Sequence, residues 1–295
     1  MTRKTELRAK AHTLVRNEIV RATFGALVTM GATTGSGLLA YAAGVEPKWV
    51  EINRISLRLS GLPTAFHGYK IVQFSDMHAG KWFPPDRIAE TVRMVNNECP
   101  DLVAITGDFV TYTHRYTPSE IVPPLLGLRA RDGVVATLGN HDYWGLGPAP
   151  IRQVIHEAGM IDLNNDVYTI ERDGAILHMA GVDSAREKMA RIDVTLGKLP
   201  KEGTAILLAH EPDYADISAR ANRFSLQLSG HSHGGQVVVP LYGPPRLPPL
   251  GKKYYAGLYQ VNHMQLYTNR GIGVVGIPVR FFCRPEITVI TLEGD

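Results

Sequence analysis

Side chains that can bind metal ions occur in five short clusters along the chain. The clusters contain aspartate, histidine and asparagine, and in order they are Asp76-Met77-His78, Gly107-Asp108, Gly139-Asn140-His141-Asp142, His210 and Gly230-His231-Ser232-His233. Carboxylate, amide and imidazole groups form a mixed oxygen and nitrogen set that suits Mn, Fe or Zn ions. The set lacks the thiolates expected of a structural zinc site. The sequence therefore predicts a centre for divalent transition-metal ions.

Each cluster follows a short apolar run. These runs are Lys70 to Phe74, Leu102 to Ile105, Val134 to Leu138, Ala205 to Leu208 and Phe224 to Leu228. A further run spans Ile176 to Ala180, and the alternating stretch Val50 to Leu59 predicts a strand that leads into the domain. The length and β-branched content of the runs indicate buried strands. Reactive residues of such a fold lie in loops beyond the carboxyl ends of the strands.

Two amphipathic helices are predicted between these strands. The first carries Ile88, Val92 and Val95 on one face. The second runs from Ile151 to Ala158 and ends at Gly159, a left-handed cap. Strands that alternate with helices predict a single α/β domain, in which a sandwich of sheets is flanked by helices.

The five clusters resemble the motif blocks of the calcineurin-like metallophosphoesterases, in the same order and without a gap from Asp76 to His233. The resemblance implies a four-layer metallophosphoesterase-type sandwich of two mixed β-sheets flanked by helices. It also implies two divalent metal ions, whose identity as Mn, Fe or Zn is left open. Carried over residue by residue, it assigns Asp76, His78 and His233 to one ion, Asn140, His210 and His231 to the other, and Asp108 to a bridge between them.

The stretch from Ile71 to Glu293 also resembles a membrane-associated bacterial branch of this family. The likeness rests on Phe74 to His78, Gly230 to Gln236 and Cys283 to Ile287. Relatives in that branch act on phosphodiesters, and a related group cleaves the pyrophosphate bond of UDP-2,3-diacylglucosamine. The resemblance thus implies hydrolysis of a phosphodiester or pyrophosphate bond, in a lipid or a UDP-acyl-sugar substrate.

Two adjacent cations predict a mechanism in which a metal-activated hydroxide attacks phosphorus in line. His141, one position past Asn140, is expected to donate a proton or hydrogen bond to the leaving oxygen or to a phosphoryl oxygen, and Asp142 is expected to orient its ring. A phosphomonoesterase of the same fold and a non-catalytic metal-binding module remain alternatives. The intact Asn140-His141-Asp142 triplet favours an enzyme, because a binding module has no need of the leaving-group histidine.

Two other motifs compete with the metal interpretation. Gly230 to Gly234 matches Gly-x-Ser-x-Gly, the nucleophile elbow of serine hydrolases, but Val237 to Pro240 follow where an elbow needs a helix. No Asp or Glu lies between Ser232 and His263, where the acid of a catalytic triad would be expected. A serine hydrolase is therefore not expected. Gly271 to Gly276 fits a dinucleotide motif, yet Pro278 stands where the helix would begin, so a glycine-rich turn between terminal strands is predicted.

The amino-terminal 45 residues differ in composition from the rest of the chain. Residues 1–21 are predominantly basic and residues 22–45 carry no charge, which predicts a cytoplasmic-side segment followed by a membrane anchor or signal. Residues 48–295 would form the catalytic domain, on the extracytoplasmic side of a bacterial inner or plasma membrane. Cleavage near Ala42 would instead give a secreted or periplasmic protein.

Composition gives three further expectations. The formal net charge of +3 does not indicate a nucleic-acid-binding face. Cys99 and Cys283 are too few for a disulfide framework and are expected to be buried. The proline-rich segment Leu241 to Tyr255 is either a loop that faces a membrane or a lipid substrate, or a rigid cover of the domain.

Overall fold

The computed structural model describes residues 36–294, and the chain divides into two compact units, Met1–Val45 and Glu46–Asp295. Every named strand and the whole predicted metal centre belong to the second unit.

The described part of the first unit, residues 36–45, is helical and includes a π-helical turn at Tyr41–Val45. The predicted basic segment at 1–21 and most of the predicted anchor or signal at 22–45 lie outside the described residues. Among residues 36–294, no helix combines the length and the hydropathy needed to cross a membrane.

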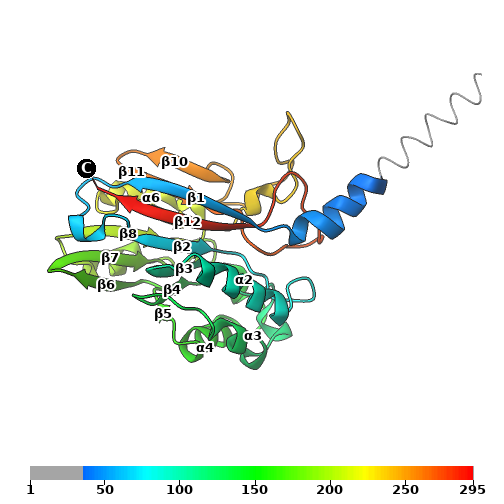
Figure 1. Cartoon of the computed structure of the whole chain (residues 1–295), viewed down its shortest axis with the longest axis horizontal. Helices are drawn as coiled ribbons and strands as arrows, with labels where there is room; N and C mark the ends of the chain where they lie inside the picture. Colours follow the sequence, from blue (N-terminus) through cyan, green and yellow to red (C-terminus); the bar gives the residue numbers. More distant parts are fainter. Residues whose placement is uncertain (1–35, 295) are drawn as a thin grey trace, which may run out of the picture. The chain divides into compact units, whose positions relative to one another are not determined.

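Two six-stranded sheets form the second unit (Figure 1). The first sheet has the order β1 (Glu51–Arg58), β12 (Glu286–Glu293), β2 (Lys70–Phe74), β3 (Leu102–Thr106), β4 (Val134–Thr137) and β5 (Ile161–Asp162). The second has the order β10 (Gly257–Val261), β11 (Met264–Thr268), β9 (Leu226–Ser229), β8 (Thr204–Leu208), β7 (Ala175–Gly181) and β6 (Asp166–Arg172). Strands β2 to β5 are parallel, as are β7, β8, β9 and β11. Both sheets are mixed, because β12, β6 and β10 each pair antiparallel with a neighbour.

Helices cover the outer face of each sheet. The first sheet is covered by α2 (Pro85–Asn97), α3 (Pro118–Leu125) and α4 (Ala149–Glu157), and the second by α5 (Ile192–Lys198) and α6 (Ala215–Ser218) with their neighbouring turns. The predicted sandwich of two mixed β-sheets flanked by helices is confirmed.

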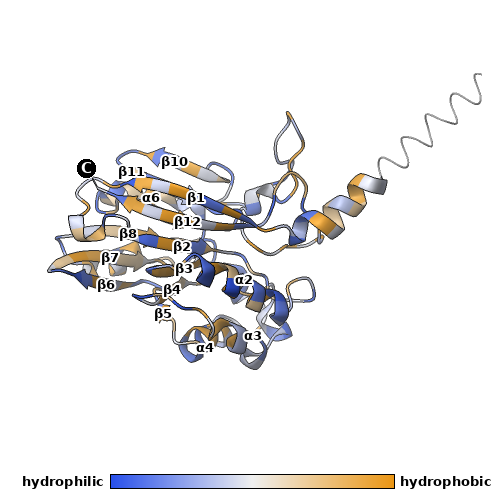
Figure 2. Ribbon diagram, in the orientation of Figure 1, coloured by the Kyte–Doolittle hydropathy of each residue, from blue (hydrophilic) through white to orange (hydrophobic). Residues whose placement is uncertain are grey.

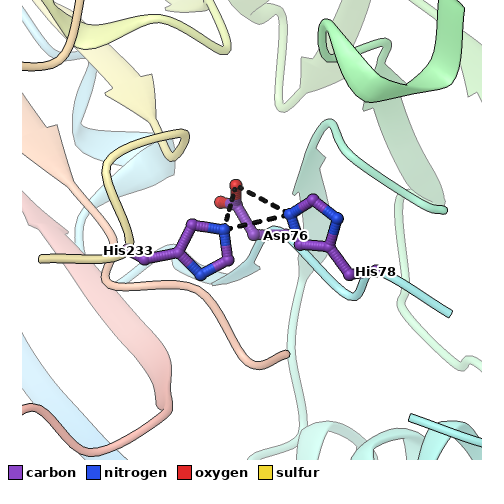
Figure 3. Close-up of side chains that lie close together, drawn as sticks. All are labelled: Asp76, His78 and His233. Atoms are coloured by element: carbon purple, nitrogen blue, oxygen red, sulfur yellow. Dashed lines mark hydrogen bonds and ion pairs between the residues drawn. The ribbon is translucent and has the colours of Figure 1, made fainter. Parts of the chain in front are cut away.

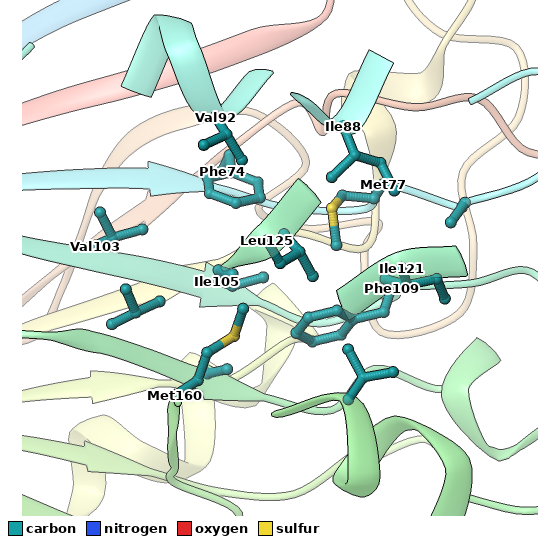
Figure 4. Close-up of a cluster of buried hydrophobic side chains, with 14 of the residues drawn as sticks. Phe74, Met77, Ile88, Val92, Val103, Ile105, Phe109, Ile121, Leu125 and Met160 are labelled. Carbon is teal, nitrogen blue, oxygen red and sulfur yellow. The ribbon is translucent and has the colours of Figure 1, made fainter. Parts of the chain in front are cut away.

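Apolar side chains fill the space between the first sheet and its helices (Figure 4). Ile88 and Val92 of α2 and Leu125 of α3 pack there against Val103 and Ile105 of β3. Each such side chain contributes roughly 1.5–3 kcal/mol when it is fully buried. A second cluster joins the two sheets through Ile71, Leu102, Ala104, Leu177, Met179, Ile206, Leu208, Leu226 and Leu228. The loops at the ends of these strands therefore extend from a rigid base.

The two predicted helices are present as α2 and α4, and Gly159 has the expected left-handed conformation, with a φ of 68°. The glycine-rich turn at Gly271 to Gly276 lies between β11 and β12, as predicted. Cys283 is buried, but the expectation for Cys99 is wrong. Cys99 follows the carboxyl end of α2 with a φ of 50° and is exposed, because it belongs to the turn that leaves the helix.

Candidate metal centre

Loops at the carboxyl edge of the first sheet carry the acidic part of the predicted site. Asp76 and His78 follow β2, Asp108 follows β3 and Asn140 follows β4. The N–H of Asp76 donates to the carbonyl of Gly107 at 3.0 Å, and the N–H of His78 donates to the carbonyl of Asp108 at 3.0 Å. These backbone bonds hold the first two loops side by side.

Two loops of the second sheet supply the remaining imidazoles. His210 follows β8, and His231 and His233 follow β9. The N–H of Gly230 donates to the carbonyl of His210 at 3.0 Å. The N–H of His231 donates to both carboxylate oxygens of Asp76, at 3.1 and 3.0 Å, and so connects the two sheets. All seven residues predicted as metal ligands are thereby gathered, buried, at one edge of the sandwich.

Asp76, His78 and His233 point toward one another (Figure 3). The Nε2 atoms of His78 and His233 lie 3.0 Å apart. Oδ1 of Asp76 lies 3.3 Å from Nε2 of His233 and 4.0 Å from Nε2 of His78. Two imidazole nitrogens and a carboxylate oxygen in so small a space are suited to one cation.

Asp108 lies between this group and a second one. Its Oδ2 atom is 3.5 Å from Nε2 of His78 and 3.2 Å from Nε2 of His210. Its other oxygen, Oδ1, accepts the N–H of His141 at 2.8 Å, which fixes the carboxylate plane. Asp108 thus has the position that a bridging ligand requires.

The second group consists of Asp108, His210 and His231, whose ligand atoms lie within 4.8 Å of one another. Nδ1 of His210 donates to the carbonyl of Thr106 at 2.6 Å, and Nε2 of His231 donates to the carbonyl of Pro249 at 2.8 Å. A carbonyl that holds one ring nitrogen fixes the tautomer and leaves the other nitrogen to bind an ion.

Asn140, which is predicted to bind the second ion, and His210 have buried polar atoms without a hydrogen-bond partner among the described residues. These atoms are Oδ1 and Nδ2 of Asn140 and Nε2 of His210, the last of which lies near Asp108 but outside hydrogen-bonding geometry. Buried polar groups are nearly always satisfied, so such atoms indicate a missing partner. An amide oxygen and an imidazole nitrogen both suit a divalent transition metal, and the residues present therefore fit the implied ion.

The charge states of three of the histidines also fit a metal-binding site. Burial lowers the pKa of His78 to about 3 and that of His231 to about 4, and it lowers the pKa of His233 well below its ordinary value. These imidazoles are neutral near pH 7, which is the form that binds metals. Burial acts in the same direction on His210, but the Asp108 carboxylate more than offsets it and raises the pKa of His210 well above its usual range. A proton at His210 and a cation therefore compete for one position.

Five of the predicted ligands have left-handed backbone conformations. The φ values are 53° for Asp76, 47° for His78, 53° for Asp108, 69° for His231 and 53° for His233. Each such conformation costs roughly 1–2 kcal/mol for a residue with a Cβ atom. Backbone strain of this kind concentrates at functional sites, where it aims side chains that a relaxed loop would not.

Close packing of the loops explains two of the glycines. A Cβ atom on Gly107 would lie 2.6 Å from the backbone nitrogen of Gly139 and 2.6 Å from Nδ1 of His210. A Cβ atom on Gly139 would overlap the Asp108 carboxylate. Gly107 is therefore required by the close approach of Gly139 and His210, and Gly139 by the close approach of the Asp108 carboxylate.

The predicted role of Asp142 in orienting the His141 ring is wrong in its geometry. Oδ2 of Asp142 accepts the N–H of Gly139 at 2.9 Å, and Oδ1 accepts the N–H of Val110 at 3.2 Å. Both oxygens are therefore engaged with backbone groups, which the spacing of the triplet cannot reveal. Asp142 holds two loops of the centre together.

The ring of His141 is positioned by other residues. Its Nδ1 atom lies 3.2 Å from the carbonyl of Thr111, and its ring centroid lies 3.8 Å from that of Trp144. The ring also packs edge-on against that of His78, with the centroids 4.7 Å apart. His141 is thus next to the first group, as its predicted role requires, although neither Thr111 nor Trp144 belongs to a recognisable motif.

Arg280 is a fully buried side chain of the centre that the sequence did not indicate. Its Nη2 atom donates to the carbonyls of Gly273, Arg270 and Gly271 at 2.7, 2.9 and 2.9 Å. The same atom lies 3.4 Å from Nδ1 of His233. The guanidinium therefore packs behind the His233 ring and fixes the loop after β11.

A groove of about 1360 Å³ opens over the two groups. Its aromatic and basic lining residues include Lys81, Trp82, Tyr112, Arg115, Tyr116, Trp144 and Arg186. The lining residues of the later segments 237–252 and 274–279 are largely apolar and include Val237, Pro245, Leu247, Pro248, Val274, Val275, Ile277 and Val279, together with Arg246 and Lys252. Among the described lining residues, only His78, Asp108, His141, His231, Ser232 and His233 lie in a cluster predicted from the sequence.

Ser232 does not have the geometry of a nucleophile. Its Oγ atom donates to the carbonyl of Tyr255 at 2.5 Å and accepts the N–H of Gly234 at 3.1 Å. The residues that follow form a single 3-10 turn, His233–Gly235, rather than a helix. The expectation that this motif is not a serine-hydrolase elbow agrees with this arrangement.

Comparison with known proteins gives relatives along nearly the whole chain. The chain is 37% identical to the uncharacterized metallophosphoesterase YkuE of Bacillus subtilis, over 95% of this chain and 98% of that protein. It is 30% identical to the phosphodiesterase YaeI of Escherichia coli, over 90% of this chain and 95% of that protein. A zebrafish (Danio rerio) transmembrane protein with a metallophosphoesterase domain is 32% identical over 85% of this chain, which spans 58% of the longer protein.

Among solved structures, the NAD nucleotidase of Haemophilus influenzae matches 69% of this chain and 50% of its own, with a TM-score of 0.48 and 15% identity. The sequence comparisons identify the family more specifically than this structural match does. The model of the family described as calcineurin-like phosphoesterase matches residues 69–235, which include all five clusters up to His233. The chain belongs to the calcineurin-like phosphoesterase family.

Proposed function

We propose that the protein is a phosphodiesterase that depends on two divalent metal ions. The position of Asp108 carries this proposal, because one carboxylate oxygen lies between His78 of the first group and His210 of the second. When bound, two divalent cations supply positive charge for the phosphoryl oxygens and lower the pKa of water, which suits them to phosphate-ester hydrolysis. Asp76, His78 and His233 would hold one ion and Asn140, His210 and His231 the other.

The chain itself would provide the proton for the leaving group. The Thr111 carbonyl engages Nδ1 of His141, which leaves Nε2 to pass a proton to the leaving oxygen of a substrate in the groove. Contact with the Trp144 ring holds the imidazole in place. Asp142 would act through the backbone of Gly139 and Val110, as a positioning residue.

The groove supports a diester or pyrophosphate substrate with groups on both sides of the scissile bond. Its volume of about 1360 Å³ exceeds what a small phosphomonoester fills, and its lining combines basic and aromatic residues with apolar ones. The basic and aromatic residues suit an anionic or ring-containing group, and the apolar residues suit an acyl chain. A lipid phosphodiester or a UDP-acyl sugar has both features. The name of the relative YaeI, a phosphodiesterase, agrees with a diester substrate.

A substrate screen tests the proposal. The purified full chain is freed of metal with a chelator, reloaded separately with Mn, Fe or Zn, and assayed with bis-p-nitrophenyl phosphate, p-nitrophenyl phosphate, a phospholipid and a UDP-linked acyl sugar. We expect metal-dependent hydrolysis with a higher kcat/KM for the diesters than for the monoester. Faster hydrolysis of the monoester would indicate a phosphomonoesterase. No turnover of any substrate by the metal-loaded chain would indicate a binding module.

We also propose that residues 1–45 hold this domain at the extracytoplasmic face of a bacterial membrane. The basic stretch before residue 22 and the uncharged stretch after it support this orientation. A reporter that is active only outside the cytoplasm, fused after residue 295, should be active in cells. A silent reporter on a well-expressed fusion would contradict the orientation.

A further inference from the structure

A short hairpin stands beside the mouth of the groove. The N–H of Val239 donates to the carbonyl of Gly243 at 3.0 Å, and the N–H of Gly243 donates back at 2.8 Å. Leu241 and Tyr242 form the tip of this hairpin, and their exposed fractions, 111% and 77%, are far above those expected of apolar side chains. The segment projects from the body in Figure 1, and Figure 2 shows apolar residues along it.

The hairpin is joined to a second segment that also exposes apolar side chains. Val237 forms a parallel bridge with Phe281, and the N–H of Val238 donates to the Phe281 carbonyl at 2.8 Å. On this segment Ile277 is 71% exposed and Phe282 is 65% exposed. Trp82, which also lines the groove, is 50% exposed. We refer to Trp82, Leu241, Tyr242, Ile277 and Phe282 as the apolar rim.

The apolar rim is held in place by hydrogen bonds. Nε2 of Gln236 donates to the carbonyls of Val275 and Ile277 at 3.1 and 2.9 Å. The buried carboxylate of Glu46 accepts the N–H of Phe282 at 3.1 Å. Leu241 has a φ of 68°, a conformation that is costly for a residue with a γ-branched side chain. The structure therefore maintains these side chains in water at an energetic cost, which marks them as an interaction surface.

The exposed charged residues of the groove beside the rim are basic. Lys81, Arg115, Arg186, Arg246 and Lys252 line the groove, and Asp108, which is buried, is the only acidic residue among the described residues that line it. Apolar and aromatic side chains next to basic ones are the combination that binds an anionic lipid surface. Tyr242 and Trp82 are also suited to the headgroup level, because their rings carry a polar atom.

We propose that the apolar rim docks onto an anionic lipid surface and brings the mouth of the groove to the level of the headgroups. Leu241, Tyr242, Ile277 and Phe282 enter the acyl boundary, and Arg246 and Lys252 contact anionic headgroups. An amphiphilic phosphodiester can then reach the groove without leaving the lipid phase. This docking is separate from the proposed hydrolysis, because vesicle binding needs neither metal nor turnover.

The test places an environment-sensitive probe at the tip of the hairpin. In the full chain, Cys99 is replaced by serine, the buried Cys283 is kept, and Leu241→Cys is labelled with a nitrobenzoxadiazole dye. The matched control carries the dye at Ile217→Cys, an exposed aliphatic position of α6 that does not line the groove. Vesicles of phosphatidylcholine alone are compared with vesicles that also contain phosphatidylglycerol.

We expect the dye at position 241 to shift to the blue and gain intensity with the anionic vesicles, and the dye at position 217 to stay unchanged. If the chain sediments with vesicles while the dye at 241 remains in water, the amino-terminal segment alone binds lipid and the proposal is overturned. If the dye does not respond and the chain does not sediment, the rim does not bind lipid, and a protein partner would be its occupant.

Variants separate docking from catalysis. Leu241→Asp combined with Tyr242→Asp should weaken the rim's contribution to vesicle affinity by about tenfold or more. Neither residue lines the groove, so turnover of soluble bis-p-nitrophenyl phosphate should be retained. Arg246→Gln should weaken binding to anionic vesicles by about fivefold and leave binding to neutral vesicles unchanged. Unaltered vesicle binding in both variants would contradict the docking surface, whatever the chain hydrolyses.

Discussion

Oδ2 of Asp108 lies 3.2 Å from Nε2 of His210, a buried nitrogen that has no hydrogen bond of good geometry with any residue between 36 and 294. The same oxygen is 3.5 Å from His78, so a single carboxylate faces both halves of the centre. The chain is folded so that the carboxylate of Asp108 serves both groups of histidines.

Asp108→Asn should therefore disrupt the whole centre. The amide keeps the shape of the side chain but removes the shared negative charge, and both ions should bind at least about 100-fold more weakly. Bound metal is measured by mass spectrometry after gel filtration, alongside diester turnover. Asp132→Asn, which removes a carboxylate bonded to Tyr69 and Arg172 away from the centre, is the control and should keep its metal. A fully loaded Asp108→Asn protein would refute the bridging role.

His141→Ala should separate metal binding from turnover. The ring lies beside the first group, held by Thr111 and Trp144, and is not in either predicted ligand set. Loss of a proton donor costs roughly 10²–10⁴-fold in rate, so kcat should fall by this factor while metal content stays at the wild-type level. His156→Ala, at an exposed histidine of α4, serves as the control. Wild-type turnover in a metal-loaded His141→Ala protein would eliminate the assignment.

Arg280→Lys should weaken the site through the backbone. An ammonium group cannot reproduce the planar set of donors that Arg280 directs at Gly273, Arg270 and Gly271. We expect a loss of about 2–3 kcal/mol in the free energy of unfolding, and weaker metal binding at His233. Urea denaturation and metal titration measure the two effects.

Arg191→Lys, at an exposed arginine that pairs with Asp193, is the matched control for Arg280→Lys and should be close to neutral. Equal, small effects of the two substitutions would show that Arg280 does not position the loop.

Glu286→Gln should lower stability in a pH-dependent way. Burial raises the pKa of Glu286, but the Arg270 guanidinium and the Tyr267 hydroxyl more than offset this, so the pKa lies below its ordinary value of 4.5. A depressed folded-state pKa gives stability that is present above about pH 4.5 and lost as the pH falls through the folded-state pKa. The difference in unfolding free energy between wild type and variant, about 2 kcal/mol near pH 7, should shrink below pH 4.5.

Glu51 provides the comparison for this experiment, since its half-exposed carboxylate lies 2.9 Å from the same guanidinium. Glu51→Gln should cost less than about 1 kcal/mol. If the difference in unfolding free energy between the wild type and Glu286→Gln stays constant from pH 7 to pH 3, the buried ion pair is not its source.

Much of the centre could be predicted from the sequence because the fold is regular where the ligands lie. Asp76, Asp108 and Asn140 each follow a parallel strand, and parallel strands end at the same edge of a sheet. Residues that follow successive strands in the sequence therefore lie next to one another in the fold. The same logic applies to His210 and His231 in the second sheet.

Other features depend on contacts that no local pattern encodes. Arg280 lies 47 residues from His233 in the chain, and its role depends on where the loop after β11 folds back. Asp142 directly follows His141 in the sequence, which suits an acid that orients the His141 ring. In the fold, however, its two carboxylate oxygens accept the backbone N–H groups of Val110 and Gly139. Helix α3 was not predicted because Pro123 and Pro124 interrupt its pattern, although a Thr117 capping box starts it.

Metal stoichiometry tests the central claim most directly. The chelator-treated full chain is titrated with Mn or Zn, and bound metal and diester turnover are measured on the same samples. The account predicts two ions per chain, turnover that reaches its maximum only as the second ion binds, and a fall to one tightly bound ion in His233→Ala. A single ion per chain at full activity, or activity that persists after complete removal of metal, would contradict a two-metal phosphodiesterase.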